Sequence, residues 1–92
     1  MSQLREISGG QISGTGTIPM TARVLGGVNI VADGTNACTV LLRKNDSSGD
    51  VIFQVQTKSP YFPVAPILLD ADEIYYSITG TNGTAELYEW VE

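Results

Sequence analysis

The chain contains no histidine, so every site that depends on an imidazole is excluded. Ser-His-Asp and Cys-His activation of a nucleophile and His-containing metal centres all need that ring. The one cysteine, Cys38, cannot form an intramolecular disulfide. Because a free cysteine on an alternating apolar segment packs as a small hydrophobic residue, we expect Cys38 in the core.

Charge is also scarce. Charged residues make up 16% of the 92 residues, against about 25% in ordinary domains. The five basic residues are spread along a chain of net charge −5, and they are Arg5, Arg23, Arg43, Lys44 and Lys58. This spread argues against a phosphate-binding footprint, so we expect no nucleic-acid partner. A surface made of Ser, Thr, Asn, Gln and Gly is typical of a β-rich structural or binding module.

Long apolar runs are missing as well. No stretch reaches the roughly 18–20 residues of a membrane span, so we expect no membrane partner. The first six residues lack the apolar segment of a signal peptide, and we expect no secretion signal. The length indicates one domain, which buries only about 60–65% of its unfolded surface and therefore gains from oligomerisation.

Alternation of apolar and polar residues is what the chain does have, most clearly over residues 28–57. This stretch predicts three strands, at residues 28–32, 37–43 and 51–57. Asp33-Gly34 and residues 45–50 supply the turns, because Gly adopts positive φ and Asp bonds its own backbone. Gln54 and Gln56 form a polar row on the third strand, which predicts one face in solvent and one in the core.

The remainder of the chain predicts further short strands. We expect these at residues 18–25, 67–69, 73–79 and 85–91. Gly26-Gly27 is interpreted as a bend, and the prolines within residues 60–66 indicate an edge or crossover segment. In the last strand, Leu87, Glu89 and Val91 share one face, and we expect Leu87 and Val91 inward. Seven or eight strands with regular turns predict an all-β, single-domain antiparallel β-sandwich or jelly roll over residues 18–92.

Residues 1–17 are rich in Gly, Ser, Thr and Gln, and we interpret them as an extended N-terminal arm. Leu4, Ile7 and Ile12 are its large apolar residues. A segment this polar does not offset its ordering entropy through a core of its own. We therefore predict that Leu4, Ile7 and Ile12 attach the protein to a partner by strand addition. The alternative is that residues 4–8 form an edge strand of the protein's own sandwich.

Acidic side chains offer the main candidate chemistry. Asp70, Asp72 and Glu73 cluster, as a glycosidase pair or calcium site would, and Asp46 and Asp50 flank a loop. Solvated turns are the favoured interpretation of both, because neither a calcium-loop pattern nor a buried-acid context is present. We expect no enzyme activity, cofactor or metal.

Aromatic residues are the candidate interface. We expect Tyr61, Phe62, Tyr88 and Trp90 to bury the apolar surface that one small core leaves over, in a homotrimer or, as the next choice, a dimer. Tyr75 beside Tyr88 and Trp90 is the alternative, a platform for stacking sugars.

The run ADGTNACTVLLRKNDSSGDVIFQVQT, followed by SITGTNGTAELYEW, resembles small virion proteins of tailed bacteriophages. The resemblance spans residues 28–90. It implies a non-enzymatic β-sandwich protein of the phage particle, specifically a head decoration (cement) protein. Such proteins sit as trimers on the outer capsid surface and bind the major capsid protein. A tail or fibre component, or a glycan-binding module, is the alternative.

Overall fold

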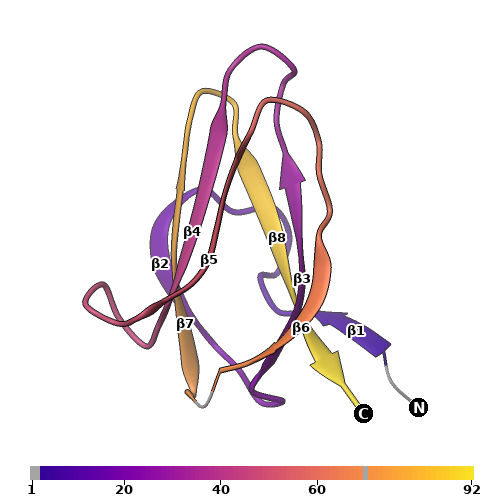
Figure 1. Ribbon diagram of the computed structural model, residues 1–92, viewed down its shortest axis with the longest axis vertical. Helices are drawn as coiled ribbons and strands as arrows, with labels where there is room; N and C mark the ends of the chain where they lie inside the picture. The colour runs from indigo at the N-terminus through magenta and orange to yellow at the C-terminus, as the bar shows by residue number, and fades with distance from the viewer. Residues whose placement is uncertain (1–2, 70) are drawn as a thin grey trace.

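The structure is a computed structural model that describes residues 3–69 and 71–92 (Figure 1). Within these residues, strands are the only regular elements. They are β1 (Gln3–Glu6), β2 (Gly14–Pro19), β3 (Val24–Val31), β4 (Cys38–Lys44), β5 (Val51–Thr57), β6 (Val64–Leu68), β7 (Glu73–Thr79) and β8 (Thr84–Val91). Sheet A has the order β1-β8-β3-β6 and sheet B the order β2-β7-β4-β5, and all pairs are antiparallel. The predicted all-β class is confirmed, with the two sheets in a sandwich-like arrangement.

The strands pair in a nested order. β4 pairs with β5, β3 with β6, β2 with β7 and β1 with β8, so the second half of the chain runs back along the first. Two further pairings, β3 with β8 and β4 with β7, join these strand pairs into the two sheets. β1 and the end of β8 therefore lie side by side, at the lower right of Figure 1.

The core is built from the inward rows of both sheets. Sheet A contributes Leu25, Val28, Ile30, Ala85 and Leu87, and sheet B contributes Cys38, Val40, Leu42, Ile74 and Ile78. Burial of Cys38 confirms its predicted core position. Leu87 is likewise inward as predicted, while Val91 at the strand end is half-buried.

The strands at residues 51–57 and 73–79 have the predicted bounds, whereas the strand predicted at residues 18–25 is wrong. β2 ends at Pro19 and β3 begins at Val24, with a turn between them. Arg23 there takes a left-handed conformation, φ 62°, which is outside the extended region that a non-glycine strand residue adopts. The alternation on either side of this turn concealed it.

The bend predicted at Gly26-Gly27 is also wrong, because β3 runs through both glycines. The register against β8 shifts between Leu25 and Gly27, which marks a β-bulge. A Cβ on Gly27 would lie 2.9 Å from Phe62 Cε1 and 3.2 Å from the carbonyl oxygen of Pro63. The glycine is needed for the close approach of a neighbouring segment.

The N-terminal residues, expected as an extended arm, instead pair with sheet strands. β1 pairs with β8, as in the edge-strand alternative, and β2 crosses the expected boundary at residue 17. The Ile7 N–H donates to the Leu87 carbonyl at 2.9 Å, and Ile12 exchanges two backbone hydrogen bonds with Ala85. Both isoleucines pack against the core cluster. The backbone bonds to β8 supply the ordering that the polar composition alone does not.

Candidate interaction surface

Outward-facing apolar side chains gather on sheet A. We define the aromatic patch as Phe62, Val64, Leu68, Tyr88 and Trp90. Along β8, Ala85 and Leu87 are buried, so Tyr88 and Trp90 alternate to the outer face. Val64 on β6 lies opposite Gly27, which in turn lies opposite Tyr88. Leu68 faces Val24 one pair further along the same outer face.

Phe62 and Tyr88 form the centre of the aromatic patch. Their ring centroids lie 5.3 Å apart with planes 25° from parallel, a stacked pair that joins the segment before β6 to β8. Phe62 also lies over Gly27, whose missing side chain leaves room for the ring. Gly27 and Tyr88 therefore hold the Phe62 ring in one position, although the ring remains exposed to solvent.

The aromatic patch is exposed to an unusual degree for a small chain. Val64 is 54% and Leu68 75% exposed, and with Phe62 they make three of the five exposed large hydrophobic residues of the described chain. Isolated exposed residues are normal on a soluble surface, but a contiguous set marks an interaction site. This set is the strongest functional signal in the structure.

The aromatic patch has an acidic surround. Burial raises the pKa of the Tyr88 hydroxyl, and the carboxylates of Glu86 and Glu6 raise it further. Among the described outward positions of β1, β8, β3 and β6, none carries Lys or Arg. A partner that binds the outer face of sheet A would therefore contact an apolar surface bordered by the carboxylates of Glu6 and Glu86.

The structure brings together three of the four predicted interface residues. Phe62, Tyr88 and Trp90 share the outer face of sheet A. Tyr61 is 51% exposed, but its backbone pairs with that of Ile30, which points into the core. Because cross-strand partners share a face, Tyr61 is directed away from the outer face. Leu4, predicted to bind a capsid partner, lies opposite Trp90 on the outer face and contacts the position that a Gly26 side chain would occupy.

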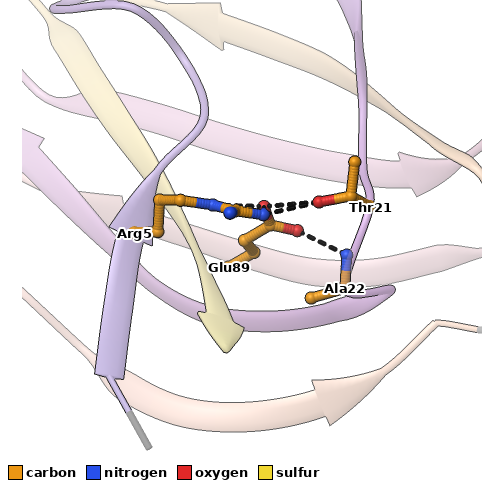
Figure 2. Close-up of polar contacts among 4 residues, drawn as sticks. All are labelled: Arg5, Thr21, Ala22 and Glu89. Atoms are coloured by element: carbon orange, nitrogen blue, oxygen red, sulfur yellow. Dashed lines mark hydrogen bonds and ion pairs between the residues drawn. The ribbon is translucent and has the colours of Figure 1, made fainter. Parts of the chain in front are cut away.

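One charged group lies in the inward row of sheet A. Glu89 is 2% exposed, and its carboxylate joins three segments (Figure 2). Its Oε1 accepts the Ala22 N–H at 2.8 Å. Its Oε2 accepts the Thr21 hydroxyl at 3.2 Å and Arg5 Nε at 2.9 Å, with a second bond from Arg5 Nη2. The carboxylate thereby ties β1 and the β2–β3 turn to β8.

The Glu89 carboxylate is held as an anion. Burial alone would raise its pKa, but the Ala22 N–H, the Arg5 guanidinium and the Thr21 hydroxyl outweigh burial and lower it. With both oxygens occupied, the group has a structural role rather than spare capacity for catalysis. The alternation of the last strand predicts Glu89 on the face of Leu87 but does not predict this cluster. The presence of an acidic residue in an inward apolar row is the sequence signal for such a cluster. The identity of Arg5 as its partner follows only from the pairing of β1 with β8.

The predicted acidic cluster lies at the surface in the part that is described. The Asp72 side chain is 88% exposed and lies 3.7 Å from Arg23 Nε, and Glu73 is exposed. Asp70, the third member of the predicted cluster, lies outside the described residues. No group of three His, Cys, Asp or Glu positioned to hold a metal ion occurs within residues 3–69 and 71–92.

A second carboxylate, Asp33, organises the loops at one end. It accepts the backbone N–H groups of Thr35 and Asn36 at 2.8 and 2.7 Å, and Asn82 Nδ2 at 3.2 Å. These bonds hold its pKa well below the usual range of an aspartate, with the Asn36 N–H as the largest cause. The β3–β4 loop, which contains the expected Asp33-Gly34 turn, is thus hydrogen-bonded to the β7–β8 turn through Asn82.

Comparison of the chain with protein-family models, with curated proteins and with solved structures gave no match. The described residues form no helix of the length and hydrophobicity that crosses a membrane. No enclosed pocket is present in the described part of the chain. The candidate site is therefore an open surface, the aromatic patch.

Proposed function

We propose that this protein is a non-enzymatic structural protein of a tailed-phage particle, a head decoration protein that binds the major capsid protein on the outer capsid surface. The single observation that carries the proposal is the aromatic patch. Burial of such a surface against a large assembly stabilises both partners, as expected for a protein that cements a shell. The resemblance of residues 28–90 to phage virion proteins gives the partner its identity.

We further propose that the two sheets form a jelly roll. A jelly roll is a long antiparallel hairpin of eight strands wound into two sheets. The pairing of β1 with β8, β2 with β7, β3 with β6 and β4 with β5 supports this topology. Jelly rolls occur in viral capsid proteins and in lectins, so the topology fits a virion role.

Binding to capsid shells tests the proposal. Purified protein is mixed with DNA-free heads of the phage that encodes it, and bound protein is measured after sedimentation. Val64→Lys and Leu68→Lys are expected to abolish binding, because each buries an unpaired ammonium group in the contact. Thr15→Lys, on the outer face of sheet B, is the matched control and is expected to bind as the original chain does. Full binding by the patch variants would contradict the proposal.

A second candidate function is glycan binding by a tail or fibre component. The Phe62–Tyr88 stack offers an apolar surface next to hydrogen-bonding groups. These groups are the Glu86 carboxylate and the Asn29 amide, whose Nδ2 donates to Glu86 Oε1 at 2.8 Å. Titration with host cell-wall oligosaccharides, followed by Trp90 fluorescence, distinguishes this role. A saturable change that Phe62→Ala removes would favour the glycan; no change favours the capsid.

A further inference from the structure

Tyr88 lies at the centre of the aromatic patch, and the strand register places a different group on each side of it. Phe62 stacks on its ring from the side of β3. Trp90 follows two residues later on β8 and shares the outer face. The other two sides carry carboxylates, because Glu6 of β1 is the cross-strand partner of Tyr88 and Glu86 precedes Tyr88 by two residues. An aromatic ring on an apolar face is thus bordered by two acids.

Both carboxylates are held in place by uncharged donors. Glu6 Oε1 accepts the Gly10 N–H at 2.6 Å, and Glu86 Oε1 accepts the Asn29 amide at 2.8 Å. Neither carboxylate forms an ion pair with a described residue, and the second oxygen of each accepts no hydrogen bond from one. After burial, these two carboxylates are the causes of the raised pKa of the Tyr88 hydroxyl, so their charge lies near the ring. Diagonal neighbours on paired strands have Cβ atoms about 7–8 Å apart, close enough for one cation to interact with both.

The basic residues of the chain do not neutralise this face. Arg5 is directed to the inward row, where it pairs with Glu89, and Arg23 in the β2–β3 turn lies 3.7 Å from Asp72. The other three lie in β4 or directly after β5 of sheet B. A two-fold contact between two copies through this face would bring like charges together, and nucleic acid or an anionic membrane would meet the same repulsion. Charge complementarity therefore favours a cationic partner.

We propose that the aromatic patch binds an arginine-bearing apolar segment of a partner protein, with the guanidinium group over the Tyr88 ring between Glu6 and Glu86. Arginine suits this position better than lysine, because the planar guanidinium group both stacks on an aromatic ring and donates several hydrogen bonds. Apolar residues beside the arginine cover the exposed Val64 and Leu68. The inference rests on the surface of the proposed function and deepens it by giving the partner its chemistry.

Short peptides test this chemistry without reference to the natural partner. The probes are the acetylated and amidated tripeptide leucine-arginine-leucine and a matched peptide in which citrulline, the uncharged isostere, replaces arginine. Trp90 is the one tryptophan of the chain, so its fluorescence reports on the aromatic patch. The arginine peptide is expected to bind about five- to tenfold more tightly than the citrulline peptide. This preference is expected to shrink in 1 M salt, where the screening length falls to about 3 Å.

Charge-neutral variants test the two carboxylates. Glu6→Gln and Glu86→Gln each remove a charge and keep an oxygen that accepts the present hydrogen bond. Each is expected to reduce the preference for the arginine peptide about two- to threefold, and the double variant to abolish it. Glu73→Gln removes an exposed acid from β7 of sheet B and is the matched control, which is expected to keep the full preference. An unchanged preference in the double variant would overturn the proposal, and so would equal binding of the two peptides or binding of neither.

Binding to capsid heads distinguishes this inference from the proposed function. If heads bind the original chain and the double variant equally well, the head-binding role holds and the arginine chemistry is wrong. If the peptides are discriminated as expected and heads are not bound, the arginine site stands and its partner is another protein. Displacement of the peptide by a neutral oligosaccharide, or by self-association of the chain, would assign the aromatic patch to a glycan or to a second copy and overturn the inference.

Discussion

The outer faces of the two sheets differ sharply, although their inner faces are alike. The outer face of sheet A carries the aromatic patch. On sheet B, hydroxyl and amide side chains dominate the corresponding positions: Thr15, Thr17, Thr39, Ser77, Thr79, Gln54 and Gln56. The bulky residues on this face are Leu41, Arg43, Val51 and Tyr75, of which Val51 is exposed. The outer face of sheet B is polar enough to remain in solvent. Burial of the apolar outer face of sheet A against a partner is favourable, because it removes apolar area from water.

This difference separates stability from recognition. The inner rows of both sheets hold the fold, so the outward residues of sheet A are available for a partner. Substitutions in the inner rows and on the outer faces test this contrast, and those in the inner rows are expected to have the largest effect on stability.

Truncation of the inner rows is expected to cost the same in both sheets. Leu87 of sheet A and Leu42 of sheet B are each fully buried. Leu87→Ala and Leu42→Ala are each expected to lower the free energy of unfolding by about 2–5 kcal/mol, through lost burial and a residual cavity. Urea denaturation measures both. A loss under about 1 kcal/mol in only one of them would show that the sheets do not share one core.

The Arg5–Glu89 pair gives sheet A an ionic element in its inward row. Arg5→Ala leaves the buried carboxylate with Thr21 and Ala22 alone, and is expected to cost about 1–3 kcal/mol because half of the arginine side chain is in solvent. Thermal unfolding at neutral pH measures it. Arg43→Ala, in which the lost bond is to the Gly49 carbonyl, is the control and should cost less.

The same pair predicts an acid-dependent loss of stability. Because the pKa of Glu89 is lowered in the folded state, its contribution is complete above the ordinary value of 4.5 and is lost as the pH falls through the lowered value. Glu89→Gln is therefore expected to destabilise the protein more at pH 7 than at pH 3, in parallel urea titrations. Asp33→Asn separates the contribution of the other carboxylate with a lowered pKa. An equal cost at both pH values would contradict an ionised Glu89.

Gly27 underlies the aromatic patch, so filling its space is expected to disturb that patch. Gly27→Ala sets a methyl group against Phe62 and the Pro63 carbonyl, at an expected cost of about 1–2 kcal/mol. Adding Phe62→Ala removes the nearest clash, and the two changes together should cost less than their sum. Strict additivity in this double-mutant cycle would show that the ring does not lie over Gly27.

The smallest effect is expected on the outer face itself. Leu68→Ser removes a side chain that is 75% exposed, and should change the free energy of unfolding by no more than about 0.5 kcal/mol. Thr15→Ser on sheet B should do the same. A Leu68→Ser loss above about 1 kcal/mol would mean that the patch already stabilises the isolated chain.

The strands with strict alternation were predictable from sequence, and those shaped by glycine were not. β7 has the expected bounds because Ile74, Tyr76 and Ile78 recur at every second position. β5 also has the expected bounds, although Ile52 interrupts its alternation at a β-bulge against β4. At Gly26-Gly27 the same rule failed. Glycine signals either a turn or a close approach, and only the position of Phe62 decides between them. At residues 18–25 the alternation continues through a turn made by Arg23, which carries no glycine to mark it.

The candidate site was predictable in composition and not in geometry. Phe62, Tyr88 and Trp90 were expected at an interface, but grouping them with Tyr61 needed a register that sequence does not supply. Although Tyr61 and Phe62 are adjacent, Tyr61 pairs with the inward-facing Ile30, whereas Phe62 stacks on Tyr88 of the outer face. The N-terminal residues show the converse limit: their composition indicates weak burial, while their backbone bonds with β8 depend on residues some 80 positions away.

The nested pairing of the strands has a consequence for how the protein is made. β4 and β5 are neighbours in sequence, whereas β1 must wait for β8, which ends at Val91. Sheet A is therefore incomplete until β8 has left the ribosome, and the hairpin β4–β5 is the first pair available. Contacts this distant in sequence make folding slow, on the order of milliseconds to seconds. Until then the β5 edge and the inward rows are exposed on the nascent chain, and early contact between neighbouring chains competes with folding.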